Sequence, residues 1–507
     1  MRKDLPEVAL QATCNGLIYD WSYQFITPEA VEKYANKRLP KNFDEARKQL
    51  LNGTYRNISE NREVSHVLSR GRHSVLNDGE HSKFAKIARK LRSGQWLGST
   101  GKPIQHVVNI GVGGSDLGPL MASFALKEFA TDIQKHQLET HFVSSMDGGQ
   151  LYAVLPVVDP ETTVFIITSK SFGTIDTFAN VDTVKIWAQE GLQKHAKTLQ
   201  DWMEHHVIGI SANTKKMTDY GIPPAHQLTF PESIGGRFSM WSAIGLAIAT
   251  SCGVQVFQRM LDGAHMMDEH FATAPVTENI PLLMALLGIY NREERHINNL
   301  AVLPYDGRFR HLPSYLQQLD MESNGKQYTA NGNALNQPTG PIIWGGFGPN
   351  GQHAFFQHLH QGYDNFTADF VVVLHRDTKR FSDSVTKSLK GQQHLSVANC
   401  LAHRRLMAVG QASDNPANHY PGGHPNSLFA LKELTPESFG AIIAAYEHKV
   451  FTQGVVWGLN SFDQPGVELG KEIAKDTYKA VIDKKLGENS NVLFDASTDA
   501  LIQWVHD

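Results

Sequence analysis

The feature that most constrains the fold is an alternation of short apolar segments with helix-like segments, which begins near residue 104. Residues 106–119 read HVVNIGVGGSDLGP, a β-rich run that leads into a glycine turn and then into an amphipathic stretch. Two more apolar runs follow at 141–145 and 162–169, each succeeded by polar turn residues and helix-like sequence. Strands that alternate with helices at this spacing are typical of βαβ units and predict a parallel sheet.

The alternation resumes in the second half of the chain, with apolar runs at 299–305 and 368–376 and a helical run at 437–459. Two α/β domains are therefore expected, joined near residues 250–285 without a Pro/Gly/Ser-rich linker. Before them, two helical patterns, at 27–39 and 42–53, indicate a helical and polar start. We predict four parts: an N-terminal helical segment over 1–70, a first α/β domain over 71–255, a second over 256–456, and a C-terminal segment with a helix over 457–507.

Composition and charge exclude several classes of protein. With 507 residues, 41% of them apolar and 19% charged, the chain has a globular composition and the length for several domains. A net charge of −4 gives no basic surface for nucleic acid and no polybasic membrane anchor. The longest apolar stretch, 241–257, is too short and too interrupted to span a membrane.

Cysteine usage and the N-terminus indicate the compartment. The three cysteines, Cys14, Cys252 and Cys400, are far apart and form neither a disulfide framework nor a metal-binding pair. The first ten residues, MRKDLPEVAL, lack the apolar core of a signal peptide. We expect a soluble, cytoplasmic protein.

Two loops could hold a phosphate. Gly111, Gly113 and Gly114 leave backbone N–H groups open to an anion, although Asp116 stands where a dinucleotide fingerprint needs its third glycine. The alternative is that these glycines only permit a tight turn. The second loop, TSKSFGTID at 168–176, follows an apolar strand, and its alternative is a Ser/Thr-rich helix cap. Because both loops follow predicted strands, together they favour a phosphate-binding site at the carboxyl edge of a sheet.

Acid–base residues occur in four further segments. Arg237 follows a double glycine and suits a developing oxyanion, or a buried ion pair. Asp320 and Glu322 are both candidate bases, and on a helix Glu322 would share a face with Gln318. Three histidines, at 353, 358 and 360, are also candidates, and for them we prefer acid–base chemistry to zinc binding. The last candidates are Gln464 and Lys471, which would share a face if the stretch between them is helical.

Taken together, these segments resemble the glucose-6-phosphate isomerase family. GGRFSMWSAIGL (235–246) and FDQPGVELGK (462–471) look like its two signatures. IGVGGSDLGP, DMESNGK, GQHAF followed by HQG, and YEHKVFTQGV are similar to further blocks in the same order. The matches extend from about residue 106 to residue 475, which is most of the chain.

The resemblance implies a fold, a reaction and an assembly. The fold is α/β, with two doubly wound, mainly parallel-sheet domains of the sugar-isomerase type and helical N- and C-terminal extensions. The reaction interconverts glucose 6-phosphate and fructose 6-phosphate through an enediolate, without a metal or an organic cofactor. The family resemblance also implies a homodimer with composite active sites, to which the histidine matching His360 is contributed by the neighbouring subunit.

The resemblance also assigns roles by position. Glu322 matches the base that moves the proton between C2 and C1, Arg237 the residue that steadies the enediolate, and His360 and Lys471 the ring-opening pair. The implied substrate-binding residues are Gly114, Ser115, Ser169, Lys170, Ser171, Thr174, Gln318 and Gln464.

Two departures from the family pattern affect the expected affinity for substrate. Gly173 removes a hydroxyl from the phosphate loop, and Pro465 stands where tryptophan is common. Two other functions remain open: an isomerase that also accepts mannose 6-phosphate, and a non-catalytic sensor of sugar phosphates. The sensor would be expected to lack the base or the ring opener, whereas Glu322 and His360 are both present.

Overall fold

The computed structural model describes residues 7–71, 73–130, 138–195, 197–377, 381–483 and 494–505. They form two compact units, Met1–Ser461 and Phe462–Asp507. Both large sheets belong to the first unit, and the domain boundaries predicted at residues 71, 256 and 457 remain predictions. Among the described residues, no helix has the length and the apolar character needed to cross a membrane.

The first sheet has five parallel strands in the order β6-β5-β7-β8-β9. The predicted apolar runs form three of them. The strands are β5 (His106–Ile110), β6 (Glu139–Val143), β7 (Thr163–Thr168), β8 (Val207–Ser211) and β9 (Gln227–Thr229). β7 is buried throughout, as a central parallel strand covered on both faces should be.

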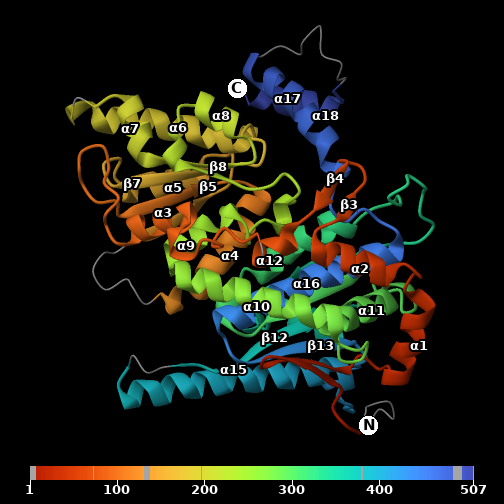
Figure 1. The fold of residues 1–507 in the computed structure, drawn as a ribbon. Helices are drawn as coiled ribbons and strands as arrows, with labels where there is room; N and C mark the ends of the chain where they lie inside the picture. The colour runs from red at the N-terminus through yellow and green to blue at the C-terminus, as the bar shows by residue number, and fades with distance from the viewer. Residues whose placement is uncertain are drawn as a thin grey trace. The chain divides into compact units, whose positions relative to one another are not determined.

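Helices cover both faces of this sheet (Figure 1). Val108, Ile110 and Phe165 pack against apolar side chains of α6, α7 and α8, and α4 and α9 lie on the other face. The helices of this region are α3 (Lys83–Arg92), α4 (Leu117–Leu126), α5 (Gly149–Val154), α6 (Ile175–Leu192), α7 (Leu199–His206), α8 (Thr214–Asp219) and α9 (Leu246–Cys252).

The second sheet has six strands in the order β1-β2-β13-β12-β10-β11. Four are parallel to one another: β10 (Asn299–Pro304), β11 (Ile342–Gly345), β12 (Thr367–His375) and β13 (Asn426–Glu433). Leu428 and Ala430 share a core with α15, whereas Phe429 contacts Tyr446 of α16. This alternation along β13 shows that α15 and α16 lie on opposite faces of the sheet (Figure 1).

The helices around the second sheet include the predicted run at 437–459, which forms α16. They are α10 (Val254–Thr273), α11 (Ile280–Glu293), α12 (Leu312–Leu316), α13 (Gly348–Gly351), α14 (Phe356–Gln361), α15 (Asp383–Val409) and α16 (Pro436–Trp457). α10 and α11 pack against α16 (Figure 1). Two mainly parallel sheets covered by helices confirm the predicted α/β fold class.

The first seventy residues differ from the helical segment that we predicted. The expected helices are present as α1 (Pro28–Arg38) and α2 (Phe43–Asn52), but β1 (Gln11–Cys14) and β2 (Leu17–Tyr23) precede them. β2 pairs antiparallel with β13 and completes the second sheet. A small hairpin, β3 (Tyr55–Asn57) and β4 (Arg62–Val64), follows. The helical prediction was wrong for 11–23, where β1 and β2 pair with each other as a local hairpin and β2 also pairs with the distant β13.

The second unit contains α17 (Glu468–Asp483) and α18 (Ala496–Trp504). α17 confirms the helix predicted near the C-terminus. It is amphipathic in sequence and much of its surface is exposed.

Candidate active site

Two predicted loops lie side by side because β5 and β7 are neighbouring parallel strands that end at the same edge. An ideal Cβ built on Gly111 would lie 3.2 Å from the backbone oxygen of Thr168, which directly precedes the second loop. On Gly114, a Cβ would lie 2.0 Å from the backbone oxygen of Gly236, so any side chain is excluded there. These glycines therefore bring the first loop into contact with the phosphate loop on one side and with the Arg237 segment on the other.

The predicted phosphate loop is closed by its own hydroxyls. The Ser169 and Thr174 hydroxyl oxygens lie 2.9 Å apart, and the Gly173 backbone N–H donates to the Ser169 hydroxyl over 3.4 Å. Thr174 occupies the N-cap position of α6 but makes no side-chain cap hydrogen bond. The first turn of an 18-residue helix thus keeps amides available to an anion, which weighs against the simple cap interpretation.

Two lysines bring positive charge to this loop. Burial, with a smaller contribution from the charge of Arg62, lowers the pKa of Lys170 to about 8, so this lysine stays mostly protonated at neutral pH. The Lys216 ammonium donates to the Ser171 backbone oxygen over 3.0 Å. An ideal Cβ built on Gly173 would lie 3.3 Å from the same ammonium nitrogen. The departure at Gly173 therefore removes a hydroxyl and leaves room for a cation. Sequence analysis missed Lys216, which follows β8, the next strand of the sheet.

Arg237 and Glu322 are brought together. Arg237 Nη1 lies 3.4 Å from Glu322 Oε2, and the arginine is only 3% exposed. Arg237 Nε donates to the Ser323 hydroxyl and Nη2 to the Ser461 backbone oxygen, each over 2.7 Å. The guanidinium is therefore fixed by protein groups, and its contact with Glu322 leaves that carboxylate partly accessible.

Glu322 ends a π-helical turn, η11 (Gln317–Glu322), and not the α-helix that we expected. Single π turns are rare and occur frequently at functional sites. The two candidate acids have different partners, since Asp320 Oδ2 accepts from the buried Lys449 ammonium over 2.8 Å. Asp320 is thus a buried ion-pair partner, and Glu322 is the accessible acid of the two.

Two amide side chains near Glu322 in sequence, those of Asn324 and Gln318, have different surroundings. Asn324 donates to the Val450 backbone oxygen and accepts from the Ser461 hydroxyl, so it does not orient Glu322. Gln318 lies next to the first glycine loop, since an ideal Cβ on Gly113 would be 2.9 Å from Gln318 Nε2. The Gln318 side-chain oxygen is buried without a hydrogen-bond partner in the described part of the chain, as expected of a group that awaits a ligand.

A network of buried polar side chains packs against the Arg237 segment. The Tyr315 hydroxyl lies 3.4 Å from both the Arg237 backbone oxygen and the Glu447 carboxylate. Glu447 also accepts from the Trp241 indole over 2.9 Å and forms an ion pair with Arg70, whose guanidinium stacks 4.5 Å from the Trp241 ring. No sequence motif pointed to this network, because its members come from four separate segments.

His360 lies elsewhere in the first unit, on α14. Its Nε2 is 2.9 Å from His403 Nδ1, and its ring also contacts Tyr420. None of the described partners of His360 is Glu322 or Arg237. Burial, followed by the charges of His403 and His424, lowers the pKa of His360 to about 4, so the imidazole is neutral at pH 7.

Gln464 and Lys471 belong to the second unit, whereas Glu322 belongs to the first. Lys471 is exposed on α17 and its ammonium lies 2.9 Å from Glu468. Gln464 precedes the short helix η13 (Pro465–Val467) and has an extended φ of −147°. The two residues therefore do not lie on one continuous helix face, because helical geometry starts only after Gln464.

The fold and the candidate site together are typical of one class: α/β isomerases of phosphorylated sugars, with a loop predicted to bind phosphate at a sheet edge and a carboxylate beside an arginine. Comparison with known proteins identifies the family. The family model described as Phosphoglucose isomerase matches residues 20–502. The chain belongs to the phosphoglucose isomerase family, which confirms the resemblance seen in its motifs.

Individual relatives agree with this assignment. A glucose-6-phosphate isomerase from Idiomarina loihiensis is 64% identical over 489 residues, which cover 96% of this chain and 98% of that protein. One from Psychrobacter cryohalolentis is 43% identical and covers 97% of this chain and 91% of its own. The crystal structure of a glucose-6-phosphate isomerase from Chlamydia trachomatis has a TM-score of 0.80 at 28% identity, over 98% of this chain and 93% of that one.

Proposed function

We propose that this chain uses Glu322 and Arg237 to interconvert D-glucose 6-phosphate and D-fructose 6-phosphate through an enediolate. The isomerase activity itself, a step of glycolysis and gluconeogenesis, follows from membership of the family and from near full-length similarity to glucose-6-phosphate isomerases. The observation that carries the residue assignment is the 3.4 Å contact between a partly accessible carboxylate and a buried, fixed guanidinium.

The phosphate is the first group to be bound in this proposal. Ser169, Ser171 and Thr174 supply hydroxyls, the start of α6 supplies backbone amides, and Lys170 and Lys216 supply charge. Gly114 and Ser115 contact the substrate from the neighbouring loop. Binding the unreactive end of the sugar orients C1 and C2 towards Glu322, so that binding energy favours the reacting geometry.

Glu322 then removes the proton from the carbon next to the carbonyl. Charge accumulates on oxygen as the enediolate forms, and the Arg237 guanidinium stabilises it without having to reorient, because Ser323 and Ser461 already hold it. Glu322 returns the proton to the adjacent carbon while a second proton passes between the C1 and C2 oxygens, which completes the isomerisation. Gln318 is positioned to bind a sugar hydroxyl with its unpartnered amide oxygen.

His360 and Lys471 open the sugar ring in this proposal. Ring opening needs one group to protonate the ring oxygen and another to accept the hydroxyl proton. A neutral imidazole is the form that accepts a proton, which agrees with the lowered pKa of His360. Gln464 is a further substrate contact near Lys471 in sequence.

We further propose a cytoplasmic homodimer in which His360 completes the active site of the neighbouring subunit. What supports the dimer is that His360 is buried among other histidines and has no described contact with Glu322 or Arg237. Small sugar phosphates are the expected partners, and the net charge of −4 argues against nucleic acid and membrane surfaces.

A coupled assay tests the proposed function. The purified chain, supplied with fructose 6-phosphate and EDTA, should form glucose 6-phosphate, which a dehydrogenase converts to a measurable signal. Mannose 6-phosphate in parallel separates a strict isomerase from one that also accepts the C2 epimer. Absence of turnover despite tight binding of fructose 6-phosphate would indicate the sensor alternative instead. Loss of turnover with EDTA that one divalent ion restores would contradict a metal-free mechanism.

A further inference from the structure

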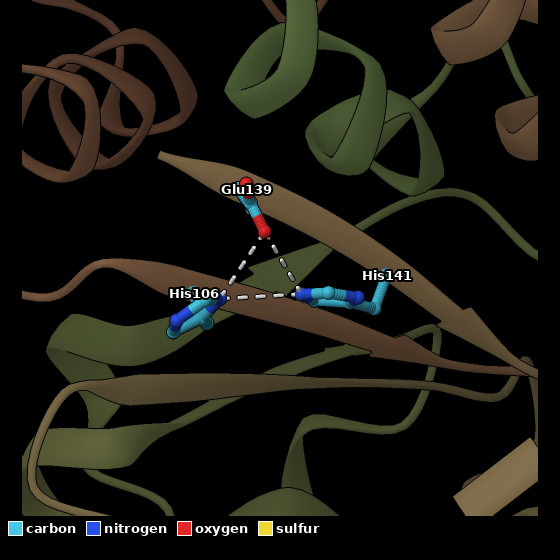
Figure 2. A group of neighbouring side chains, drawn as sticks. All are labelled: His106, Glu139 and His141. Atoms are coloured by element: carbon cyan, nitrogen blue, oxygen red, sulfur yellow. Dashed lines mark hydrogen bonds and ion pairs between the residues drawn. The ribbon is translucent and has the colours of Figure 1, made fainter. Parts of the chain in front are cut away.

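Three side chains that the isomerase reaction does not use gather at the amino-terminal ends of β5 and β6 (Figure 2). His106 pairs in register with Glu139, and His141 lies two residues further along β6. Since side chains two apart in a strand share a face, all three point to the same side of the sheet. Among the described strands β6 is the outermost of its sheet, so this cluster bridges an edge strand and the neighbouring strand β5.

The distances within the cluster fit the coordination of a metal ion. His106 Nδ1 lies 3.2 Å from His141 Nε2. Two nitrogens bound tetrahedrally to zinc at 2.0–2.1 Å would lie about 3.3 Å apart. Glu139 Oε2 lies 3.9 Å from the first nitrogen and 4.0 Å from the second. The carboxylate needs to approach by less than about 1 Å to reach ligand spacing, and its side chain is 62% exposed.

We propose that His106, Glu139 and His141 bind one divalent transition-metal ion, with Zn²⁺ as the reference case. Two imidazoles and one carboxylate are ligands that zinc, nickel and copper accept, whereas magnesium and calcium prefer oxygen alone. Three protein ligands leave a coordination position for water. Both histidines are largely shielded from solvent, with 18% and 20% of their side chains exposed, so little side-chain freedom is lost on binding.

Neighbouring charges shift the pKa of His141 in opposite directions. Burial, with help from the charges of His106 and Lys127, lowers the pKa of His141, and Glu139 opposes that shift. The positive charge of Lys127 also repels the ion, so removing that charge should tighten metal binding.

The place of the cluster separates it from the isomerase reaction. The substrate loops follow the carboxyl ends of the strands, whereas His106 and Glu139 are the first residues of β5 and β6. A five-residue strand separates the two edges by roughly 13–17 Å. A bound ion would thus bridge β6 and β5 without contacting the substrate. Isomerase activity should therefore not depend on the metal ion.

Titration of the untagged, full-length protein with ZnCl₂ tests the proposal by calorimetry, and Co²⁺ absorption reports the ligand set. The wild-type chain should bind one high-affinity ion, and the double substitution His106→Gln/His141→Gln should weaken that affinity at least tenfold. Lys127→Gln should tighten binding. His205→Gln, which removes an exposed histidine of the same unit, should leave the affinity unchanged.

Glu139→Gln keeps the proposal testable if the double variant does not fold, because this side chain is exposed. Zn²⁺ should slow hydrogen exchange at the backbone amides of β6 in the wild-type chain, and the effect should shrink in Glu139→Gln. The proposal is overturned if the wild-type chain binds no stoichiometric ion, if the double variant keeps its affinity within threefold, or if exchange in β6 does not respond to Zn²⁺.

Discussion

Replacing Glu322 with glutamine should stop proton transfer while leaving the fold intact. Glutamine keeps the size of the side chain but lacks a basic carboxylate. A positioned general base contributes about 10²–10⁴-fold to a rate, which corresponds to about 2.7–5.4 kcal/mol of barrier. Turnover in the coupled assay should fall by at least a hundredfold, and exchange of the C2 proton with deuterated water should fall in parallel.

The structure predicts a small effect of this substitution on stability. Arg237 loses an ionic contact at 3.4 Å but keeps its hydrogen bonds to Ser323 and Ser461, so its N–H groups stay hydrogen-bonded. Because Glu322 is partly exposed, the free energy of unfolding should change by less than about 1 kcal/mol. A phosphorylated competitive inhibitor should therefore bind to the variant nearly as well as to the wild-type chain.

Asp320→Asn is the matched control. It removes the charge that pairs with the buried Lys449 ammonium, and breaking a buried ion pair costs about 3–5 kcal/mol. This variant should unfold at a lower denaturant concentration, yet its folded fraction should still exchange the C2 proton. Near-normal turnover in Glu322→Gln, together with a folded but inactive Asp320→Asn, would refute the assignment of the base.

Four further predictions follow from the site and its surroundings. Ser169→Ala should weaken the binding of a phosphosugar inhibitor about ten- to a hundredfold, since a hydrogen bond to a charged group contributes about 1.5–3 kcal/mol; unchanged inhibition would exclude this loop. Lys216→Met should also raise KM, and more at low ionic strength than at high, because its contribution is electrostatic. Mixing inactive Glu322→Gln with inactive His360→Ala should restore partial activity after subunit exchange if sites are composite, whereas a fully active monomer in light scattering would contradict the dimer. Burial lowers the pKa of His206 to about 4, so the unfolded chain binds more protons than the folded chain between pH 6.5 and pH 4. The free energy of unfolding should therefore decrease as the pH is lowered through this range, by up to about 1.4 kcal/mol per pH unit for this group. Urea unfolding of the wild-type chain should show this decrease, and His206→Gln should reduce it.

The sequence predicted those parts of the site that depend on local pattern. The strand at 162–169 is a continuous apolar run and is buried throughout as β7, so the polar residues after it had to emerge at the sheet edge. The same reasoning located the loop at Gly111–Ser115. Its role as a contact surface for Gly236 depends on packing between distant segments and became visible only in three dimensions.

The sequence did not predict features that depend on long-range pairing. β1 and β2 flank Asn15 and Gly16, which both have positive φ, and an Asn-Gly pair between alternating residues is a strong hairpin signal that could have been used. The π turn at Gln317–Glu322 has no comparable signature. The ion pair of Asp320 with Lys449, which distinguishes Asp320 from Glu322, depends on the position of α16 and not on the local sequence.

The pairing of β2 with β13 has a consequence for how the chain folds during synthesis. The strands of the first sheet all lie between residues 106 and 229, so that sheet can form as soon as this part has been made. In contrast, the hydroxyls of Tyr19 and Ser427, which bond across β2 and β13, are 408 residues apart in sequence. At about 5–20 residues per second, β2 waits roughly 20–80 s for its partner. During that interval the edge of β2 that later pairs with β13 is open, because β1, its hairpin partner, covers only the other edge.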